Sequence, residues 1–426
     1  MSNKVDMTVG NPARGIIKFA IPLILGYILQ QMYLIVDAAI VGRWIGVNAL
    51  AAVGASASVM FLVMGFCNGA CAGFAIPISI RVSLVMIVVI TFFACAFCDK
   101  ILHIVNTPRE IFDDAYTFLL LQFLAIPFTL TFNLFAGYIR ALGNSRQPFL
   151  FLIISSFVNI LLDVLLILIL GMGVAGAGLA TLLSQLFASI LSVWYVSRHM
   201  TMLIPHGEER AFDNKRISIL LNNGIPMGLQ VSITAIGIIL LQSSNNALGT
   251  VYVASFTAAV RIKYLFICVF DNIGVAMATY CGQNIGAGRL DRVRQGEWAA
   301  VKIMLVYFVL TALIIFPFSG YMMELFVNGG SQEVADNAAM LMRISCYFYP
   351  VLGLLSILRY SIQGLGYSNL SMLSGVMEMI ARSGVSLWLV PTFGFLGVCY
   401  GDPMAWVFAD IFLVPGFLLL YKHLKK

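Results

Sequence analysis

The sequence has very few charged residues. Of its 426 residues only 10% are Asp, Glu, Lys or Arg, while 61% are hydrophobic. A soluble domain carries about a quarter of its residues as charged side chains and cannot hide so much apolar surface. The shortage of charge therefore excludes a soluble globular protein, and the medium around most of this chain is expected to be lipid.

Sequence patterns of enzymes and of nucleic-acid-binding proteins are also missing. The chain has no nucleotide-binding loop, no zinc motif and no Ser/His/Asp set, and its four histidines lie near expected loops or ends. The net charge of +6 is scattered through short loops instead of being gathered on one domain, which argues against nucleic acid. We therefore expect no enzymatic activity, no cofactor and no nucleic-acid partner.

Long apolar runs, in contrast, are abundant. They recur from residue 14 to residue 421, and each is long enough for a helix to cross roughly 30 Å of hydrocarbon. The alternating pattern of a β-barrel is absent, so the backbone must be satisfied within helices. The fold expected is all-α, an integral membrane protein of twelve transmembrane helices, near residues 14–41, 48–79, 81–98, 114–139, 147–170, 174–197, 217–247, 251–281, 295–319, 335–362, 370–391 and 395–421.

Positive charges predict the orientation of these helices. If the N-terminus is cytoplasmic, 18 of the 25 Lys and Arg lie in cytoplasmic segments and six lie outside, with Arg382 inside a helix. The first apolar segment is too long for a cleavable signal peptide, so we expect it to be the first transmembrane helix. The prediction is a multi-pass protein of the cell inner (plasma) membrane with both termini in the cytoplasm.

The two halves of the chain resemble each other. The matching positions are Ile21-Pro22 and Ile225-Pro226, Asn68 and Asn272, Leu142-Gly143 and Leu365-Gly366, and the glycine pairs Gly173/Gly176 and Gly394/Gly397. Six helices per half keep both copies in the same orientation, which predicts two six-helix lobes related by a parallel repeat. The lobes expected are residues 1–200 and 217–426, joined by a cytoplasmic linker at residues 201–216.

The first lobe is shortened between its second and third helices. Matched positions lie 204 residues apart early in the halves and 223 apart later, so the first half is 19 residues shorter between Asn68 and Gly143. The second half has a basic, glycine-rich loop at residues 282–294, and the first half has no such loop at the corresponding place.

Carboxylates inside the expected helices are the main candidates for a functional site, because a charge within a bilayer costs about 3 kcal/mol or more. Asp37 lies near the outer end of the first helix, and Asn159 and Asp163 share one face of the fifth. Asp163 and, in the sixth helix, Thr181 lie about seven residues, or roughly 10 Å, below the outer surface. All four side chains are expected at one depth, with no lysine or arginine beside them.

Two carboxylates without a counter-charge need protons or a bound cation. Oxygen ligands from carboxylates, Asn and Thr suit a hard ion such as Na⁺, so this set of four is predicted to exchange H⁺ or Na⁺. The alternative is structural. In that case Asp37 caps a helix turn, and Asp163 hydrogen-bonds Asn159 or Thr181.

The second half differs at the corresponding positions, which are Glu378, Arg382 and Asp402. Glu378 and Arg382 have the i, i+4 spacing of a pair on one helix face, and we interpret these three as a self-neutralising structural group. Ion coupling is therefore expected in the first lobe. Further polar residues that line a cleft or join helices are Gln30, Gln242, Asn245 and Asn272. The roles of Asp271 and Asp410 are left open.

Several segments together resemble prokaryotic transporters of the multidrug and toxic compound extrusion (MATE) family, of the DinF-like branch. They are residues 21–26 (IPLILG), 36–43 (VDAAIVGR), 46–54 (GVNALAAVG), 140–144 (RALGN) and 394–397 (GFLG). The resemblance implies twelve helices in two lobes, alternating access, and export of organic cations and other xenobiotics driven by H⁺ or Na⁺. It also implies a first-lobe cation site at Asp37, Asn159, Asp163 and Thr181.

The function expected is a secondary active multidrug exporter. It would take small cationic or amphipathic substrates, work as a monomer in the bilayer, and need only its coupling ion. Two alternatives stay open. One is a lipid-linked saccharide flippase of the same superfamily, which would have a more cationic cavity. The other is a shortened, inactive member of the family, because such transporters normally carry a glycine-rich basic segment where this chain is short.

Overall fold

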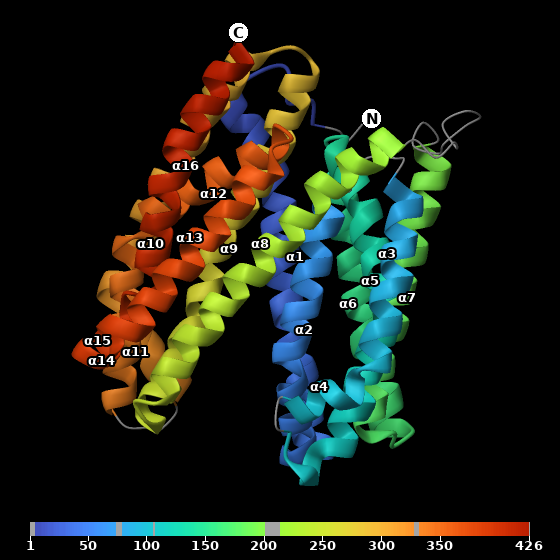
Figure 1. Ribbon diagram of the computed structural model, residues 1–426. Helices are drawn as coiled ribbons and strands as arrows, with labels where there is room; N and C mark the ends of the chain where they lie inside the picture. The colour runs from blue at the N-terminus through green and yellow to red at the C-terminus, as the bar shows by residue number, and fades with distance from the viewer. Residues whose placement is uncertain (1–4, 74–78, 105–106, 201–213, 328–331, 426) are drawn as a thin grey trace. The chain divides into compact units, whose positions relative to one another are not determined.

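The computed structural model describes residues 5–73, 79–104, 107–200, 214–327 and 332–425 (Figure 1). Over these ranges the chain is helical and has no strand, so the expected all-α fold is confirmed. Within the same ranges nine helices are long and apolar enough to cross a membrane, or up to eleven if each of two bent pairs is one span. With the shorter apolar helix at residues 79–96, these segments account for the twelve expected.

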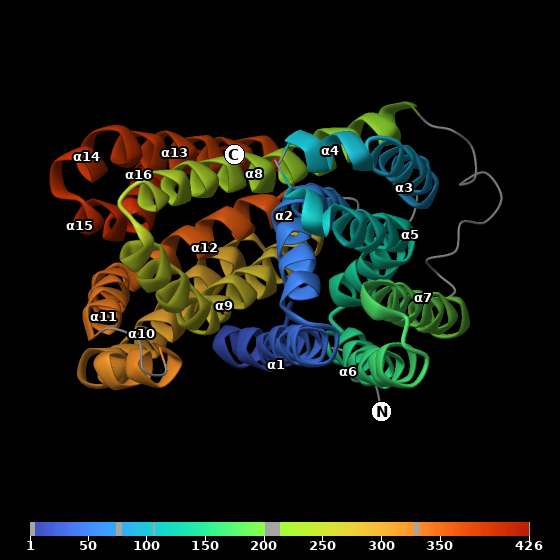
Figure 2. The ribbon, with the colours of Figure 1, turned by 90° about the horizontal axis from the view of Figure 1, so that it is seen from below.

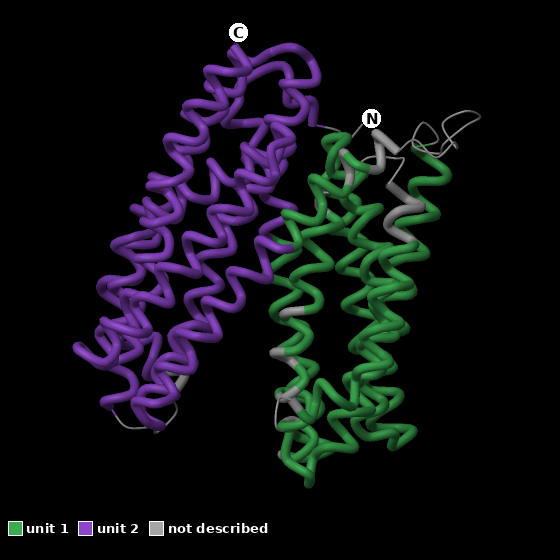
Figure 3. Tube along the Cα trace, in the orientation of Figure 1, with its two compact units in different colours: residues 1–4, 25–228 green, residues 5–24, 229–426 purple. Residues whose placement is uncertain are grey.

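The chain divides into two compact units, coloured separately in Figure 3. The first contains residues 25–228 and the second contains residues 5–24 and 229–426, apart from the undescribed stretches. The lobes expected at residues 1–200 and 217–426 stay a prediction, because residues 5–24 and 217–228 are grouped differently in these units. The expected linker lies mostly outside the described residues, and so does the shortened connection at residues 74–78.

Unit 1 contains most of α1 (Pro12–Ile40), the start of α8 (Asn214–Asn246) and the elements between them. These are η1 (Val41–Ile45), α2 (Val47–Gly73), α3 (Ser79–Ala96), α4 (Cys98–Ile104), η2 (Arg109–Ile111), α5 (Phe112–Ala141), α6 (Arg146–Asp163), η3 (Val164–Ile169) and α7 (Gly173–His199). Helix α5 contacts α2, α3 and α7. It buries Leu119, Phe123 and Leu130 at helical spacing, so one apolar stripe of α5 forms the core of this unit.

Unit 2 contains the remaining helices. They are α9 (Thr250–Gly286), α10 (Leu290–Val327), α11 (Gln332–Tyr347), α12 (Tyr349–Gly364), α13 (Ser368–Gly384), η6 (Val385–Leu389), α14 (Val390–Phe393), α15 (Phe395–Cys399) and α16 (Gly401–Lys425). Helix α9 contacts α10, α11 and α12, and α16 lies along α13 (Figure 2). The fully buried rings of Phe270, Tyr280 and Tyr349 fill the space between these helices.

One expected helix is two in the structure. The sequence predicts a single helix at residues 335–362, but α11 ends at Tyr347 and α12 begins at Tyr349, with a bend of 54° between them. Pro350 lies in the first turn of α12. Proline has no backbone N–H and its ring clashes with the carbonyl four residues earlier, so it cannot continue the ladder of α11.

The repeated Leu-Gly motif has the same structural role in both units. After α5, Gly143 adopts a φ of 82° and the N–H of Asn144 donates to the carbonyl of Ile139 at 3.1 Å. After α12, Gly366 adopts a φ of 89° and the N–H of Tyr367 donates to the carbonyl of Ile362 at 3.1 Å. Both motifs are Schellman caps, which need a residue that tolerates positive φ. The sequence repeat therefore corresponds to a repeat in structure.

A short N-terminal segment is bound to unit 2 by the basic stretch at residues 282–294. The sequence predicts a loop here, but residues 282–286 end α9, residues 290–294 begin α10, and only residues 287–289 lie between the helices. Four side chains of this stretch contact the backbone of residues 7–10, and we call them the N-terminal clamp: Gln283, Asn284, Arg289 and Arg292. Arg292 donates to the carbonyls of Met7 at 3.3 Å and Gly10 at 3.0 Å. Met7 is only 1% exposed and lies in the core of unit 2. The N-terminal clamp thus fixes residues 7–10 to this unit.

Candidate functional site

The four residues predicted to form the ion site all belong to unit 1. Asp37 lies in the last turn of α1, Asn159 and Asp163 lie one turn apart at the end of α6, and Thr181 lies in α7. The side chains of Asp37, Asn159 and Asp163 are buried, with 8%, 2% and 0% exposure, and Thr181 is half-buried. Polar groups buried this deeply in apolar helices need a partner or a ligand.

Asp37 and Asp163 are brought together by the fold. Their carboxyl groups are close enough to interact directly, although they come from α1 and α6. Tyr33, one turn before Asp37, lies within electrostatic range of both carboxyl groups and also interacts with Gln30. Among the described residues, no lysine or arginine acts on either carboxyl group. Arg43, the basic residue that follows Asp37 in the sequence, lies over the ring of Trp44 at 5.3 Å from its centroid.

Most polar atoms of this site have no hydrogen-bond partner in the described part of the chain. These atoms are both oxygens of Asp163, both side-chain polar atoms of Asn159, and Oδ1 of Asp37. The hydroxyl of Thr181 donates to the carbonyl of Ala177 at 3.2 Å, which leaves its oxygen able to accept or coordinate. The site thus offers several oxygen atoms that can coordinate a cation, and most of them have no hydrogen-bond partner among the described residues. It fits a proton shared by two carboxyl groups or a hard cation such as Na⁺.

Two π-helical segments position these carboxyl groups. The segment η1 follows Asp37 after one turn, η3 begins directly after Asp163, and the two segments contact each other and α7. A small apolar cluster around Val41, Ile167 and Ala177 packs at this end of unit 1. Single π-turns inside α-helices are frequent at functional sites because they redirect a side chain at the cost of regular hydrogen bonding.

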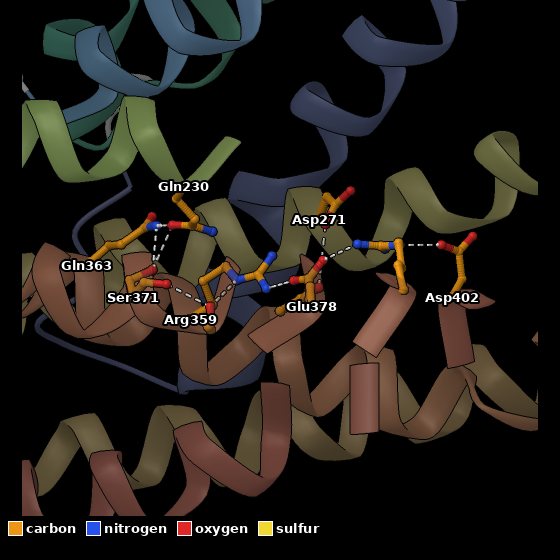
Figure 4. Close-up of polar contacts among 10 residues, drawn as sticks. Gln230, Asp271, Arg359, Gln363, Ser371, Glu378 and Asp402 are labelled. Carbon is orange, nitrogen blue, oxygen red and sulfur yellow. Dashed lines mark hydrogen bonds and ion pairs between the residues drawn. The ribbon is translucent and has the colours of Figure 1, made fainter. Parts of the chain in front are cut away.

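The corresponding region of unit 2 is a chain of ion pairs, shown in Figure 4. Arg382 donates from Nε to Asp402 at 3.0 Å and from its terminal nitrogen to Glu378 at 3.0 Å. Lys263 pairs with the other oxygen of Asp402, and Arg359 pairs with the other oxygen of Glu378. Glu378, Arg382 and Asp402 were expected to form one group, and the structure brings them together.

Lys263 and Arg359 were missed as members of this group. Both lie within helices that the sequence predicts, at residues 251–281 and 335–362, but only Arg382 was singled out as a charge inside a helix. The structure places Lys263 within α9 and Arg359 within α12. Lys263 is 3% exposed, and Arg359 also donates to Ser374 at 3.1 Å. No sequence spacing could have revealed these pairs, because each partner lies on a different helix.

The remaining predicted polar residues are scattered. Gln30 and Gln242 are exposed. The amide of Asn245 donates to the carbonyl of Tyr252 at 3.3 Å, and that of Asn272 donates to the carbonyl of Cys268 at 2.8 Å. A second polar group that the sequence did not indicate joins Gln230, Ser371 and Gln363 at 2.8–2.9 Å (Figure 4). Asn245 and Asn272 are thus bonded to backbone.

No group of three or more His, Cys, Asp or Glu side chains that could hold a metal ion occurs in the described ranges. A cation at the Asp37–Asp163 pair would therefore need the oxygens of Asn159 and Thr181 to complete its coordination.

Comparisons with known proteins agree on one family. The MatE family model matches residues 22–81, 72–165 and 226–387. The first half is matched in two pieces that overlap at residues 72–81. The Bacillus subtilis protein named "Probable multidrug resistance protein YpnP" is 28% identical over 403 residues, which cover 90% of this chain and 88% of that protein. The "Multidrug export protein MepA" of Staphylococcus aureus (strain MRSA252) is 19% identical, with 91% and 89% coverage.

Two solved structures show the same fold. One is described as the outward-facing conformation of a multidrug resistance MATE family transporter of the MOP superfamily. It has a TM-score of 0.92 and 22% identity, and the match covers 100% of this chain and 99% of that one. The other is a MOP superfamily transporter from Pyrococcus furiosus, with a TM-score of 0.91, 22% identity and the same coverage.

Proposed function

The chain belongs to the MATE family of membrane transporters, and we propose that it is a secondary active multidrug exporter that exchanges organic cations or other xenobiotics for H⁺ or Na⁺. It is a multi-pass membrane protein and a transporter, not an enzyme. Relatives named as multidrug resistance and multidrug export proteins support the substrate class. We further propose that both termini are cytoplasmic, that the membrane is the plasma membrane, and that the transporter works as a monomer.

One observation carries the coupling part of the proposal. Asp37 and Asp163 form a buried carboxyl pair without a counter-charge, next to an Asn159 whose polar atoms have no partner in the described residues. Two such carboxylates repel each other and cannot both stay ionised in an apolar interior. Binding of H⁺ or Na⁺ relieves the repulsion, so the occupied and empty sites favour different arrangements of α1 and α6.

Helix α1 supplies a route from ion binding to substrate release. Its outer part, with Asp37, belongs to unit 1, and its residues 12–24 belong to unit 2. We propose that cation or proton binding bends or repacks α1, that this releases the substrate outward, and that the lobes then rock to face the cytoplasm. Exchange follows only if ion and substrate favour different states, because a ligand with equal affinity for both shifts nothing.

The flippase alternative receives less support. A site for lipid-linked saccharides is expected to present free cations to anionic phosphates. Lys263, Arg359 and Arg382 are instead each engaged with a carboxylate of Asp402 or Glu378. For these three cations of unit 2, the internal pairing favours the exporter.

Ethidium efflux from cells tests the proposal. The wild type, the Asp37→Asn/Asp163→Asn double variant and the control Asp114→Asn should be compared at matched expression, with and without Na⁺ and with a protonophore. Asp114 suits as a control because it is an exposed carboxylate of the same unit, at the start of α5. We expect efflux by the wild type and the control but not by the double variant.

The conditions of the efflux experiment distinguish the coupling ions and the alternative functions. Loss of efflux on removing Na⁺ identifies Na⁺ as the coupling ion, and loss with the protonophore alone identifies H⁺. Undiminished efflux by the double variant would refute the role of the carboxyl pair. No efflux by a well-folded wild type would instead favour a different substrate or the inactive homologue.

A further inference from the structure

Asp410 is the least satisfied carboxyl group of unit 2. It lies in α16 and is 8% exposed, and both of its oxygens are buried without a hydrogen-bond partner among the described residues. An ionised carboxylate in such a place loses its hydration without gaining any donor in return. The ion-coupling set of unit 1 does not include this residue, so it needs a separate explanation.

The helices around α16 offer Asp410 one cation. Helix α12 brings Arg359, and α13 brings Glu378 and Arg382, while η6 and α15 contain no charged residue. Of the charged residues on α11, Glu333 and Asp336 are exposed, and Arg343 donates to Ser319 at 2.7 Å. Only Arg359 acts electrostatically on Asp410 among the described groups.

Arg359 is already occupied. Its guanidinium pairs with Glu378 and donates to Ser374 at 3.1 Å (Figure 4). Asp271, which accepts a hydrogen bond from Ser356 at 3.5 Å, also acts on Arg359. One guanidinium is therefore shared among three carboxyl groups, of which only Glu378 is in direct contact.

The charges of this region balance without Asp410. The cations are Lys263, Arg359 and Arg382, and the carboxylates other than Asp410 that pair with them or act on them are Asp271, Glu378 and Asp402. Three positive charges thus meet three negative ones. An ionised Asp410 would add an uncompensated negative charge to a buried region, which is costly in an apolar medium.

We propose that Asp410 is a second proton-binding site, separate from the Asp37–Asp163 pair, and that on losing its proton it competes with Glu378 for Arg359. The ligand is a proton and not a metal ion, because one carboxyl group supplies too few oxygens for a metal. The described chain also has no cluster of three His, Cys, Asp or Glu side chains. When Asp410 is protonated and neutral, Arg359 stays with Glu378 and links α12 to α13. When Asp410 is ionised, Arg359 is drawn toward α16.

Infrared spectroscopy of the purified protein in liposomes tests the proton directly. A protonated carboxyl group without hydrogen bonds gives a carbonyl band at the high-frequency end of the carboxylic-acid region. Other buried carboxyl groups, Asp163 among them, contribute equally to the spectra of the wild type and of both variants. We therefore expect such a band in the difference between the wild type and Asp410→Asn, and no such band in the difference between the wild type and the control Asp336→Asn. Asp336 is a matched control because it is an exposed aspartate of the same unit. A spectrum of Asp410→Asn identical to that of the wild type would overturn the proposal.

Two further variants test the competition for Arg359. In Glu378→Gln a buried negative charge is removed, so charge balance is restored if Asp410 ionises and pairs with Arg359. The band assigned to Asp410 should then disappear although Asp410 is present. Adding Arg359→Gln removes one positive charge as well, so Asp410 should take up its proton again and the band should return.

Two outcomes contradict the competition: persistence of the band in Glu378→Gln, or its absence from the double variant Glu378→Gln/Arg359→Gln. The double variant also provides a test if Glu378→Gln alone does not fold, because it removes one positive and one negative charge together and keeps their numbers equal. None of these spectra depends on transport. A failed efflux experiment and a failed infrared experiment are therefore distinguishable. The proposed proton site at Asp410 is tested independently of the proposed transport function.

Discussion

The side-chain amide of Asn284 donates to the backbone carbonyl of Met7 at 3.1 Å, across 277 residues of chain. Arg292 donates from Nε to the amide oxygen of Asn284 at 3.1 Å and so holds this side chain in place. The start of the chain is therefore fixed by side chains of the α9–α10 connection. A basic stretch whose positive charge suggested only membrane topology thus has a defined structural role.

We expect Arg292→Ala to weaken the N-terminal clamp. The substitution removes the hydrogen bonds to the carbonyls of Met7 and Gly10 and to Asn284, each made by a charged donor. The expected loss in the free energy of unfolding is about 1.5–3 kcal/mol. Thermal unfolding measures it, and Arg294→Ala is the control because Arg294 is an exposed arginine two residues further along. An equal effect of both substitutions would point to general charge instead of the clamp.

A second prediction concerns the close packing of α9 and α12. A Cβ at Gly364 would lie 2.3 Å from the carbonyl oxygen of Ala278, which is backbone and cannot move aside cheaply. We expect Gly364→Ala to lower the stability of the protein by about 2–3 kcal/mol. Gly320→Ala, inside α10 with nothing within 4 Å of its added Cβ, should instead be neutral or about 0.5–1 kcal/mol more stable. Yield and melting temperature in detergent give the comparison, and similar losses in both would argue against a backbone clash.

The ion-pair chain of unit 2 gives a third prediction. Arg382→Met keeps most of the side-chain volume but leaves Glu378 and Asp402 with one cation each. Loss of one member of a buried ionic network is expected to cost about 3–5 kcal/mol. Arg261→Met, at an exposed position of α9, should change the stability little. Chemical denaturation in micelles distinguishes the two, and an unaffected Arg382→Met would show that the network contributes no net stability.

The coupling ion is expected to stabilise the wild type. A ligand that binds only the folded state adds about 2.7 kcal/mol at a concentration a hundred times its dissociation constant. Either added Na⁺ or added H⁺ should therefore raise the melting temperature of the wild type and of Asp114→Asn. The Asp37→Asn/Asp163→Asn variant should lose that response while remaining folded. A response retained by the double variant would place ion binding elsewhere.

Most of the fold could be predicted from the sequence, because composition and the length of the apolar runs report directly on a lipid environment. The Leu-Gly motifs at Gly143 and Gly366 also had a local physical cause, a cap that needs positive φ. The break between α11 and α12 was missed because one proline in a long apolar run can begin a helix or kink one, and the pattern alone does not distinguish these outcomes.

The sites were predicted unevenly. Asp37 and Asp163 stood out as acids in apolar helices, and the repeat aligned the second-half residues Glu378, Arg382 and Asp402. Arg359 and Lys263 did not stand out, because their partners lie on other helices and no spacing in the sequence encodes a pair between helices. Long-range pairing of this kind becomes visible only once the helices are placed.

Two helices are shared by both units, and each has a proline close to the point where it passes between them. In α1 the change falls between residues 24 and 25, just after Pro22, and in α8 it falls between residues 228 and 229, just after Pro226. A proline removes one backbone hydrogen bond and softens the helix locally. If the lobes rock as proposed, α1 and α8 are expected to bend at these prolines. The energy needed to bend the two helices would then be the same in every transport cycle, whatever the substrate.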